Sequence, residues 1–279
     1  CIRDSTQYKE LTIKEFTKAA EVYDSGHAGI YEMCKDDYPP ILEELKKDGF
    51  EDLLDVGCGT GPMVELLASE FPDKRYTGLD LTPRMIEVAN AKDIENARFV
   101  VGDAEDLPFD NGTFDAVISC VGVMFAPNHQ RAAAELLRVC RPGGTIALLN
   151  WTPEGFVGEL MSIMRDYQPP QAAVPGPPLW GRQDYVSGLF GGGVQDWQGR
   201  QQMVTVDRFE NPGHFLEFFK ANFGPVVGVY RGIGEDLERS AALDRELSSL
   251  AERHARAADN GIEMDWEYLL LRGTAGEGR

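Results

Sequence analysis

Long hydrophobic runs and paired cysteines are both absent from this sequence. No apolar stretch approaches the roughly 20 residues of a membrane-spanning helix, and the N-terminal part lacks the apolar core of a signal peptide. The five cysteines are odd in number and form no CxxC pair, so neither a disulfide framework nor a zinc site is expected. We therefore expect a cytoplasmic protein with no metal site and no membrane association. Because the chain begins with Cys1 rather than Met, we also expect its recorded N-terminus to be trimmed.

Basic residues are scarce. Lys and Arg together number 27 against 46 Asp and Glu, which gives a net charge of −19. Lysine is rarest in the second part, where residues 101–279 contain Lys220 alone beside 14 arginines. A field of this sign repels phosphate groups, and no run of basic residues offsets it. The composition therefore argues against general binding to nucleic acid or to an anionic membrane.

The pattern of elements favours one α/β unit with an added cap, although 279 residues would also suit two domains of roughly 150 residues. Short apolar runs alternate with amphipathic stretches between residues 53 and 150. Strands are predicted at 53–56, 75–79, 97–101, 114–120 and 145–150, and helices at 63–71, 83–91 and 131–140. Alternation at this spacing predicts right-handed crossovers and a parallel sheet covered by helices on both faces.

The segments on either side of this unit are mainly helical. Helices are predicted at 13–23, 40–48, 156–167, 212–222 and 236–258, and strands at 202–209 and 266–271. Residues 168–178 contain 5 prolines in 11 positions, which indicates a stiff extended loop suited to connecting a lid. No internal repeat is found.

The clearest chemical signal is the segment LLDVGCGTG at residues 53–61, which runs from a predicted strand into a predicted helix. Glycines at such a turn permit a tight bend and let a ligand approach the backbone. The helix beyond supplies free N–H groups and a partial positive charge. The spacing is GxGxG rather than the GxGxxG of dinucleotide-binding enzymes.

Two carboxylates follow the next two predicted strands. Asp80 ends the second strand, 25 residues after Asp55, where it could accept two hydrogen bonds from a ribose diol. Asp103 follows the third strand in the triplet Gly102-Asp103-Ala104, where it could accept one from an adenine amino group. Either carboxylate could instead be a polar strand end or a helix cap. Together with the glycines they indicate a site for a cofactor that contains adenosine.

The motifs resemble those of the class I S-adenosylmethionine (SAM)-dependent methyltransferases, in particular their small-molecule, methyltransferase type 11-like branch. The matching segments are LLDVGCGTG (53–61), GLDLTPRMIEVA (78–89), VVGDAEDLPFDNGTFDAVIS (100–119) and LLRVCRPGGTIALLNW (136–151). NWTPEGF (150–156) and PPLWG (177–181) also look like segments of uncharacterised bacterial members of this family. The resemblance implies an α/β, Rossmann-like, doubly wound fold. Its mostly parallel seven-stranded sheet would carry helices on both faces and a small helical cap.

The resemblance also implies a division of the chain. Residues 1–50 would form an N-terminal helical segment that closes over the cofactor, and residues 51–151 the SAM-binding core. Residues 152–200 would be a cap or lid insertion. Residues 201–279 would complete the sheet and add the C-terminal helices.

The same resemblance implies the cofactor SAM, with S-adenosylhomocysteine (SAH) as product, and a set of residues around it. Those expected near the methionine and ribose parts are Asp55, Gly57, Cys58, Gly59, Gly61, Asp80 and the backbone of Cys120. Those expected around the adenine are Leu81, Met85, Asp103 and Ala104. Tyr23-Asp24 would close over the cofactor, as an N-terminal Tyr-Asp segment does in related enzymes.

The acceptor is less constrained, because transfer from a sulfonium needs alignment and exclusion of water more than it needs a particular catalytic side chain. A base is required only if the acceptor must lose a proton. His129, after the fourth strand, is the candidate base, although a histidine that begins a helix is more often a cap or a surface residue. Trp151, Phe156 and Trp180 could line the acceptor pocket or simply form the core of the cap. An acidic chain favours a small, uncharged or apolar acceptor methylated on oxygen, carbon or nitrogen.

Two other classes of function stay open at this point. An NAD-dependent oxidoreductase would use the same kind of sheet and the same ribose carboxylate, but the GxGxG spacing and the Gly-Asp-Ala triplet favour SAM. A non-catalytic SAM-binding protein would carry the same cofactor motifs.

Overall fold

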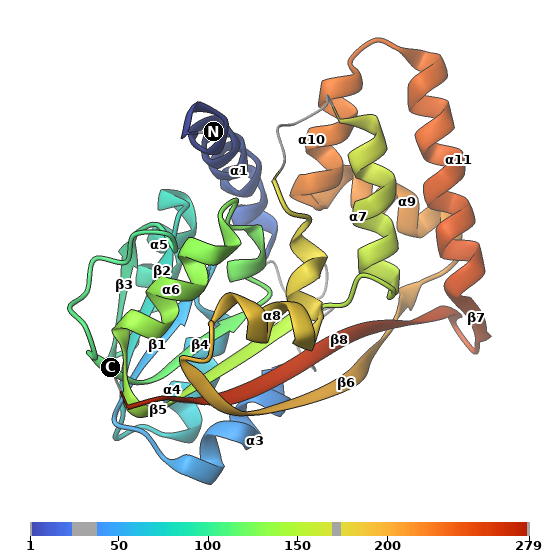
Figure 1. The fold of residues 1–279 in the computed structure, drawn as a ribbon. Coiled ribbons are helices and arrows are strands. Elements are labelled where there is room, and N and C mark those ends of the chain that lie inside the picture. Colours follow the sequence, from blue (N-terminus) through green and yellow to red (C-terminus); the bar gives the residue numbers. More distant parts are fainter. Residues whose placement is uncertain (1, 24–37, 169–173, 278–279) are drawn as a thin grey trace.

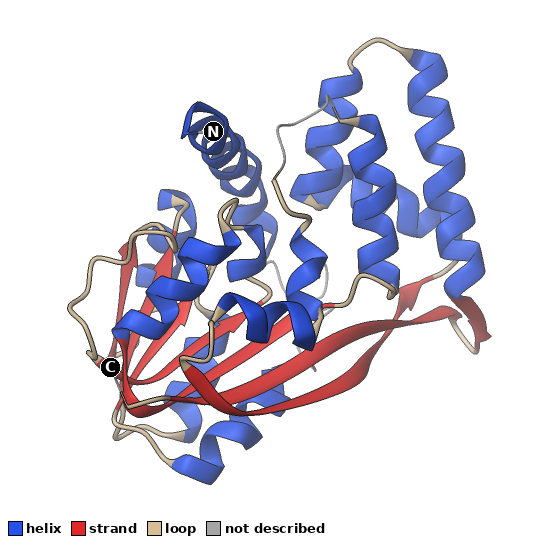
Figure 2. Cartoon of the chain, viewed as in Figure 1, coloured by secondary structure: helices blue, strands red, loops and turns tan. Residues whose placement is uncertain are grey.

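One twisted sheet runs the length of the molecule, with helices packed on both of its faces (Figures 1 and 2). The computed structural model describes residues 2–23, 38–168 and 174–277. The strands are β1 (Asp52–Val56), β2 (Arg75–Asp80), β3 (Ala97–Val101), β4 (Phe114–Cys120), β5 (Cys140–Trp151), β6 (Val194–Phe209), β7 (Ala255–Ala258) and β8 (Gly261–Ala275). Their order is β3-β2-β1-β4-β5-β8-β6, and the short β7 pairs with β8.

The sheet confirms the predicted doubly wound α/β fold. β1 to β5 pair in parallel, whereas β8 is antiparallel to both β5 and β6. The described residues form eight strands rather than the predicted seven. The difference arises because Ala255–Ala258, predicted as the end of a helix, turns back and pairs with β8 as β7.

β1 lies in the interior of the sheet, and its residues from Leu53 to Val56 are all buried. A strand covered by helices on both faces appears in the sequence as a short continuous apolar run, as this one does. β2 lies on one side of β1 and β4 on the other. The strand order therefore reverses between β1 and β4, which is where doubly wound sheets open a crevice at their carboxyl ends.

Three core helices begin where the sequence predicted them to, within about two residues. They are α4 (Pro62–Glu70), α5 (Pro83–Ala91) and α6 (His129–Val139), and α3 (Tyr38–Asp48) precedes them in the chain. Pro62 and Pro83 occupy the first helical position, where the missing N–H costs nothing. The side chain of Asn128 caps α6 by accepting a hydrogen bond from the Arg131 N–H.

A second group of helices stands over the far halves of β6 and β8, at the upper right of Figure 1. It contains α7 (Phe156–Tyr167), α9 (Pro212–Asn222), α10 (Gly224–Ile233) and α11 (Leu237–His254). These four helices pack against one another, so the described cap draws on the C-terminal part of the chain as well as on residues 152–200. Within residues 152–200, η4 (Pro177–Gly181) packs on β5, α8 (Gln183–Leu189) packs on α6 and η4, and β6 already begins at Val194.

The N-terminal helix α1 (Ile2–Tyr23) begins well before the predicted residue 13. It lies between α5 of the core and α10 of the cap, and contacts both (Figure 1). None of the helices in the described ranges has a stretch long and apolar enough to cross a membrane.

Candidate cofactor and acceptor site

A cavity of about 200 Å³ opens at the carboxyl ends of β1, β2 and β4, at the point where the strand order reverses. One part of its wall comes from the core motifs: Asp55 to Thr60, Leu79 to Thr82, Met85, Gly102 to Ala104, and Cys120 to Val123. The other part comes from α1, α7, α9 and the strands beneath them: Lys9, Thr12, Phe16, Trp151, Val157, Leu160, Met161, Phe219, Phe223 and Trp266. Cofactor motifs and cap therefore face one continuous space.

The glycine-rich turn after β1 has the left-handed backbone that its composition predicts. Gly57 has φ of 74° and Gly59 has φ of 55°, values that residues with a Cβ rarely adopt. A Cβ on Gly57 would also lie 2.6 Å from the Cα of Gly122, so the turns after β1 and β4 touch through backbone alone. This close approach leaves room for a ligand above them.

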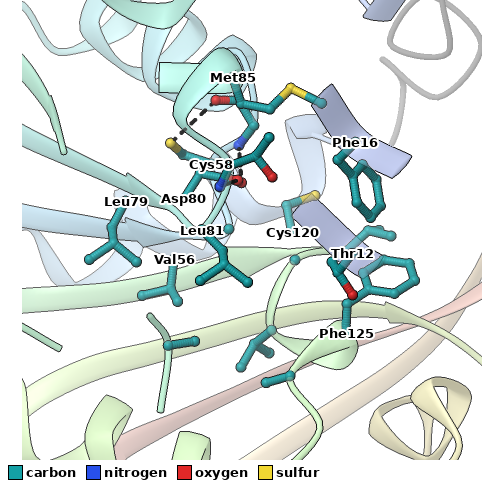
Figure 3. Close-up of a pocket in the computed structure, with 18 of the residues that line it drawn as sticks. Thr12, Phe16, Val56, Cys58, Leu79, Asp80, Leu81, Met85, Cys120 and Phe125 are labelled. Atoms are coloured by element: carbon teal, nitrogen blue, oxygen red, sulfur yellow. Dashed lines mark hydrogen bonds between the residues drawn. The ribbon is translucent and has the colours of Figure 1, made fainter. Parts of the chain in front are cut away.

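The carboxylate of Asp80 fixes the shape of this turn. One oxygen accepts the backbone N–H of Gly59 at 3.0 Å, and the other accepts that of Thr82 at 2.8 Å (Figure 3). Burial raises the pKa of Asp80, and the two backbone hydrogen bonds oppose that shift. Carboxylate oxygens can accept more than one hydrogen bond each, so Asp80 keeps capacity for two ribose hydroxyls.

Asp55 is a buried carboxylic acid that lines the cavity and is 1% exposed. Neither of its oxygens has a hydrogen-bond partner among the described residues. Burial, and then the nearby Asp80, raise its pKa to about 7. An orphaned carboxyl group of this kind fits an ammonium group brought by a ligand, because unpaired buried charge is costly.

Asp103 lies on the wall, which Ala104, Leu81 and Met85 also line. One of its oxygens accepts the backbone N–H of Glu105 at 2.9 Å, and the other accepts the ammonium of Lys9 from α1 at 2.7 Å. The cavity thus has carboxylates at three separate places, as a molecule with an amino group, a ribose and an adenine requires.

Most of the residues predicted for the cofactor meet at this cavity, although which of them touch SAM stays a prediction. Those on its wall are Asp55, Gly57, Cys58, Gly59, Asp80, Leu81, Met85, Asp103, Ala104 and Cys120, with Trp151 from the predicted acceptor set. Gly61 lies behind the wall, where it precedes α4 with φ of 83° and a Cβ would lie 2.8 Å from the Phe99 ring. The side chain of Tyr23 and all of Asp24 lie outside the described residues.

The structure places the predicted base His129 away from the cavity wall. Its ring is 2% exposed, its Nδ1 lies 2.9 Å from the Tyr185 hydroxyl, and it packs edge-on against Trp180. Burial lowers its pKa to about 4. The position at the start of α6 does follow β4, but the side chain points to the sheet face that η4 and α8 cover, so His129 is a core residue.

Phe156 and Trp180 are also core residues rather than wall residues. Phe156 is fully buried and stacks on Trp266 with ring centroids 5.2 Å apart. Trp180 belongs to η4 itself and is 1% exposed. In both cases the sequence could not distinguish an aromatic residue that lines a lid from one that holds the lid together.

Several wall residues are not predicted by the sequence because they lie far from the recognisable motifs. Lys9, Thr12 and Phe16 project from one face of α1 into the cavity region (Figure 3 shows Thr12 and Phe16). Their spacing of three and four residues is a helical signal, but the predicted helix started only at residue 13. Phe219, Phe223 and Trp266 carry no motif at all.

Comparisons with known proteins agree with this arrangement. Residues 54–148 match the model of the "Methyltransferase domain" family. The uncharacterised protein Rv1403c of Mycobacterium tuberculosis is 44% identical over 252 residues, covering 84% of this chain and 89% of the relative. A demethylmenaquinone methyltransferase of Thermotoga maritima is 28% identical over 205 residues, covering 69% and 82%. The crystal structure of YcgJ from Bacillus subtilis superposes with a TM-score of 0.59 at 19% identity, covering 88% of this chain and 100% of that one.

Fold, cavity and comparisons together define a class I methyltransferase. The chain belongs to the family of class I SAM-dependent methyltransferases. Its cofactor is SAM, which the orphaned Asp55 carboxyl and the Asp80 carboxylate at the end of β2 fit.

Proposed function

We propose that this protein transfers the methyl group of SAM to a small, largely apolar acceptor. The observation that carries the proposal is the continuity of the cavity. Its core wall has the carboxylates suited to SAM, and its other wall is almost entirely apolar, formed by Val157, Leu160, Met161, Phe219, Phe223 and Trp266. An apolar compartment of this kind favours apolar ligands, and it excludes water from the reacting atoms.

The residues of the core would hold the cofactor. Asp55 would pair with the amino group of SAM, Asp80 with the ribose hydroxyls and Asp103 with the adenine amino group. When bound, SAM supplies a methyl group on a positively charged sulfur that leaves as a neutral thioether. The chain itself then has to align the acceptor and keep the compartment dry.

No side chain on the cap wall, among the described residues, can act as a base. The wall residues from α7, α9 and β8 have no titratable group, and His129 is absent from the wall. We therefore expect an acceptor whose nucleophilic atom needs no proton removed by the enzyme, because it is already ionised or carries a free lone pair. The Thermotoga relative is named for demethylmenaquinone, an acceptor of apolar character, which supports the apolar part of this proposal.

Calorimetry and product release test the proposal in sequence. The protein is titrated with SAH and with NAD, and SAH release from SAM is then measured with apolar thiols and acidic apolar phenols against polar amines and sugars. Binding of SAH and turnover of an apolar acceptor are the expected results. Binding of NAD in place of SAH would reject the cofactor assignment, and SAH binding without turnover of any acceptor would favour a non-catalytic SAM-binding protein.

A variant pair tests where the acceptor binds. Met161→Trp fills the cap wall, and we expect it to reduce turnover at least tenfold while SAH affinity changes less than twofold. Met203→Trp introduces the same side chain on the exposed edge strand β6 and serves as the control. Equal turnover in the two variants would place the acceptor elsewhere.

A further inference from the structure

A partly buried cluster of charges joins helix α1 to the loop after β3. The ammonium of Lys9 donates to Asp103 Oδ2 at 2.7 Å and to Glu105 Oε2 at 2.6 Å. The side chain of Glu105 is 7% exposed, that of Lys9 20% and that of Asp103 31%. More than ninety residues separate Lys9 from its two partners in the sequence, so the contact is purely tertiary.

Glu105 is held from the other side as well. Its second oxygen accepts the backbone N–H of Asn128 at 2.7 Å, just before α6. Asp103 in turn accepts the Glu105 N–H. Two carboxylates held this close in a partly shielded place repel each other unless a cation lies between them. Lys9 is that cation, and it therefore sets the position of the Asp103 carboxylate.

Apolar contacts along the same helix place α1 along the cavity. Phe16 packs edge-on against Phe125 with ring centroids 5.6 Å apart, and both line the cavity (Figure 3). One turn further, Ala19 and Ala20 pack with Met85 of α5. These contacts are short-ranged and non-directional. The Lys9 ion pairs, by contrast, fix the position of α1 relative to Asp103 at that end of the cavity.

We propose that Lys9 is a cofactor-positioning residue, which holds α1 over the adenine end of the cavity and orients the Asp103 carboxylate toward the adenine amino group. The inference rests on the proposed function, because it assumes that Asp103 receives that amino group. Lys9 acts through Asp103 and through α1 rather than on the methyl group. Its removal affects the recognition of adenine more than any other part of the cofactor.

Two ligands separate this role from a structural one. SAH has an adenine amino group, and S-inosylhomocysteine has an oxygen in its place, which a carboxylate repels. The wild-type protein is expected to bind SAH more tightly than S-inosylhomocysteine by tenfold or more. In Lys9→Met the affinity for SAH is expected to fall about tenfold and the ratio between the two ligands to shrink toward one.

Two further variants complete the experiment, which uses calorimetry on the full chain. Lys9→Arg keeps the positive charge and is expected to restore most of the ratio. Lys14→Met removes an exposed lysine of the same helix and is expected to leave both affinities unchanged. Thermal unfolding of every variant is recorded alongside, so that a binding change in a variant that is still folded can be recognised.

The outcomes separate a failure of the proposed role of Lys9 from a failure of the proposed function. Equal losses for both ligands in Lys9→Met, or no loss for either, would overturn the role of Lys9 in positioning. Tighter SAH binding in that variant would overturn it too, because Lys9 would then compete with adenine for Asp103. Failure of the wild-type protein to bind SAH would instead reject the proposed function itself.

Discussion

The carboxylate of Asp80 accepts a hydrogen bond from the backbone N–H of Gly59 at 3.0 Å, so the residue that ends β2 also holds the glycine turn that follows β1. This hydrogen bond therefore links two parts of the cofactor motif that lie 21 residues apart in the sequence. Any change at Asp80 acts on the ligand and on the turn together.

We expect Asp80→Ala to weaken SAH binding by about 3 kcal/mol, roughly a hundredfold, because two hydrogen bonds to a charged acceptor are lost. Calorimetric titration with SAH measures the effect. Asp52→Ala removes a carboxylate at the start of β1, where it pairs with Arg75 at the surface, and is the control. Affinity in Asp80→Ala within threefold of the control would show that the ribose binds elsewhere.

Asp55 makes cofactor affinity depend on pH. Its pKa is raised to about 7 by burial and by Asp80, so the carboxyl is largely protonated below that pH. An ammonium group binds the ionised form, and the affinity for SAH should therefore fall as the pH drops below 7, by up to about tenfold per pH unit. SAH titrations between pH 5.5 and 8.5 measure this slope.

Asp55→Asn is the matched variant for that slope. It cannot ionise, so its SAH affinity should be lower at pH 8 and should not vary with pH through this group. If the wild-type protein and Asp55→Asn gave parallel pH profiles, another group would have to be responsible. In the free protein the raised pKa also means that ionisation of Asp55 lowers stability as the pH rises toward 7.

The core of the molecule could be predicted because its strands and turns are determined by short stretches of neighbouring residues. Buried parallel strands appear as apolar runs such as Leu53–Val56, and the glycines after β1 are required by positive φ angles at Gly57 and Gly59. The cofactor carboxylates follow strand ends directly. For these parts, residue type and position along the chain determine the geometry.

The cap and the acceptor wall could not be predicted in the same way. Helix α10 begins at Gly224-Pro225 and contains two further glycines, Gly228 and Gly232, which lower intrinsic helix propensity, so only packing shows it to be a helix. The first half of β6 is rich in Gln and shows no alternation of apolar and polar residues, because as an edge strand it has few buried positions. Periodicity predicts a helix face but not its partner, so it cannot connect Lys9 with Asp103.

His129 should contribute to stability and not to catalysis. Burial lowers its pKa to about 4, so the unfolded chain takes up a proton near pH 6.5 that the folded protein does not accept until about pH 4. Stability should therefore rise with pH between 4 and 6.5 through this group, by at most about 3 kcal/mol. His129→Gln should remove that dependence and leave SAH affinity unchanged.

Thermal unfolding of the wild-type protein and His129→Gln at several pH values measures the difference. Because all other groups titrate alike in the two proteins, the gap between their melting temperatures reports His129 alone. If the folded His129→Gln protein lost turnover, and its pH–rate profile lost the part that depends on a titrating base, His129 would have to be the catalytic base.

Glu15 links the docking of α1 to pH. It lies against α10, where a Cβ on Gly228 would overlap its carboxylate. Burial raises its pKa to about 7, while Arg231 opposes the shift. An acid whose folded pKa is raised is penalised when it ionises, so this contact weakens as the pH rises from about 4.5 to 7, and the full penalty is present above 7.

Glu15→Gln should therefore raise the melting temperature by roughly 2–4 °C at pH 8, corresponding to about 1 kcal/mol, and have little effect at pH 5. Glu10→Gln changes an exposed acid of the same helix and should have no effect at either pH. Equal shifts for Glu15→Gln at both pH values would mean that the ionised carboxylate is not what limits the packing of α1 on α10.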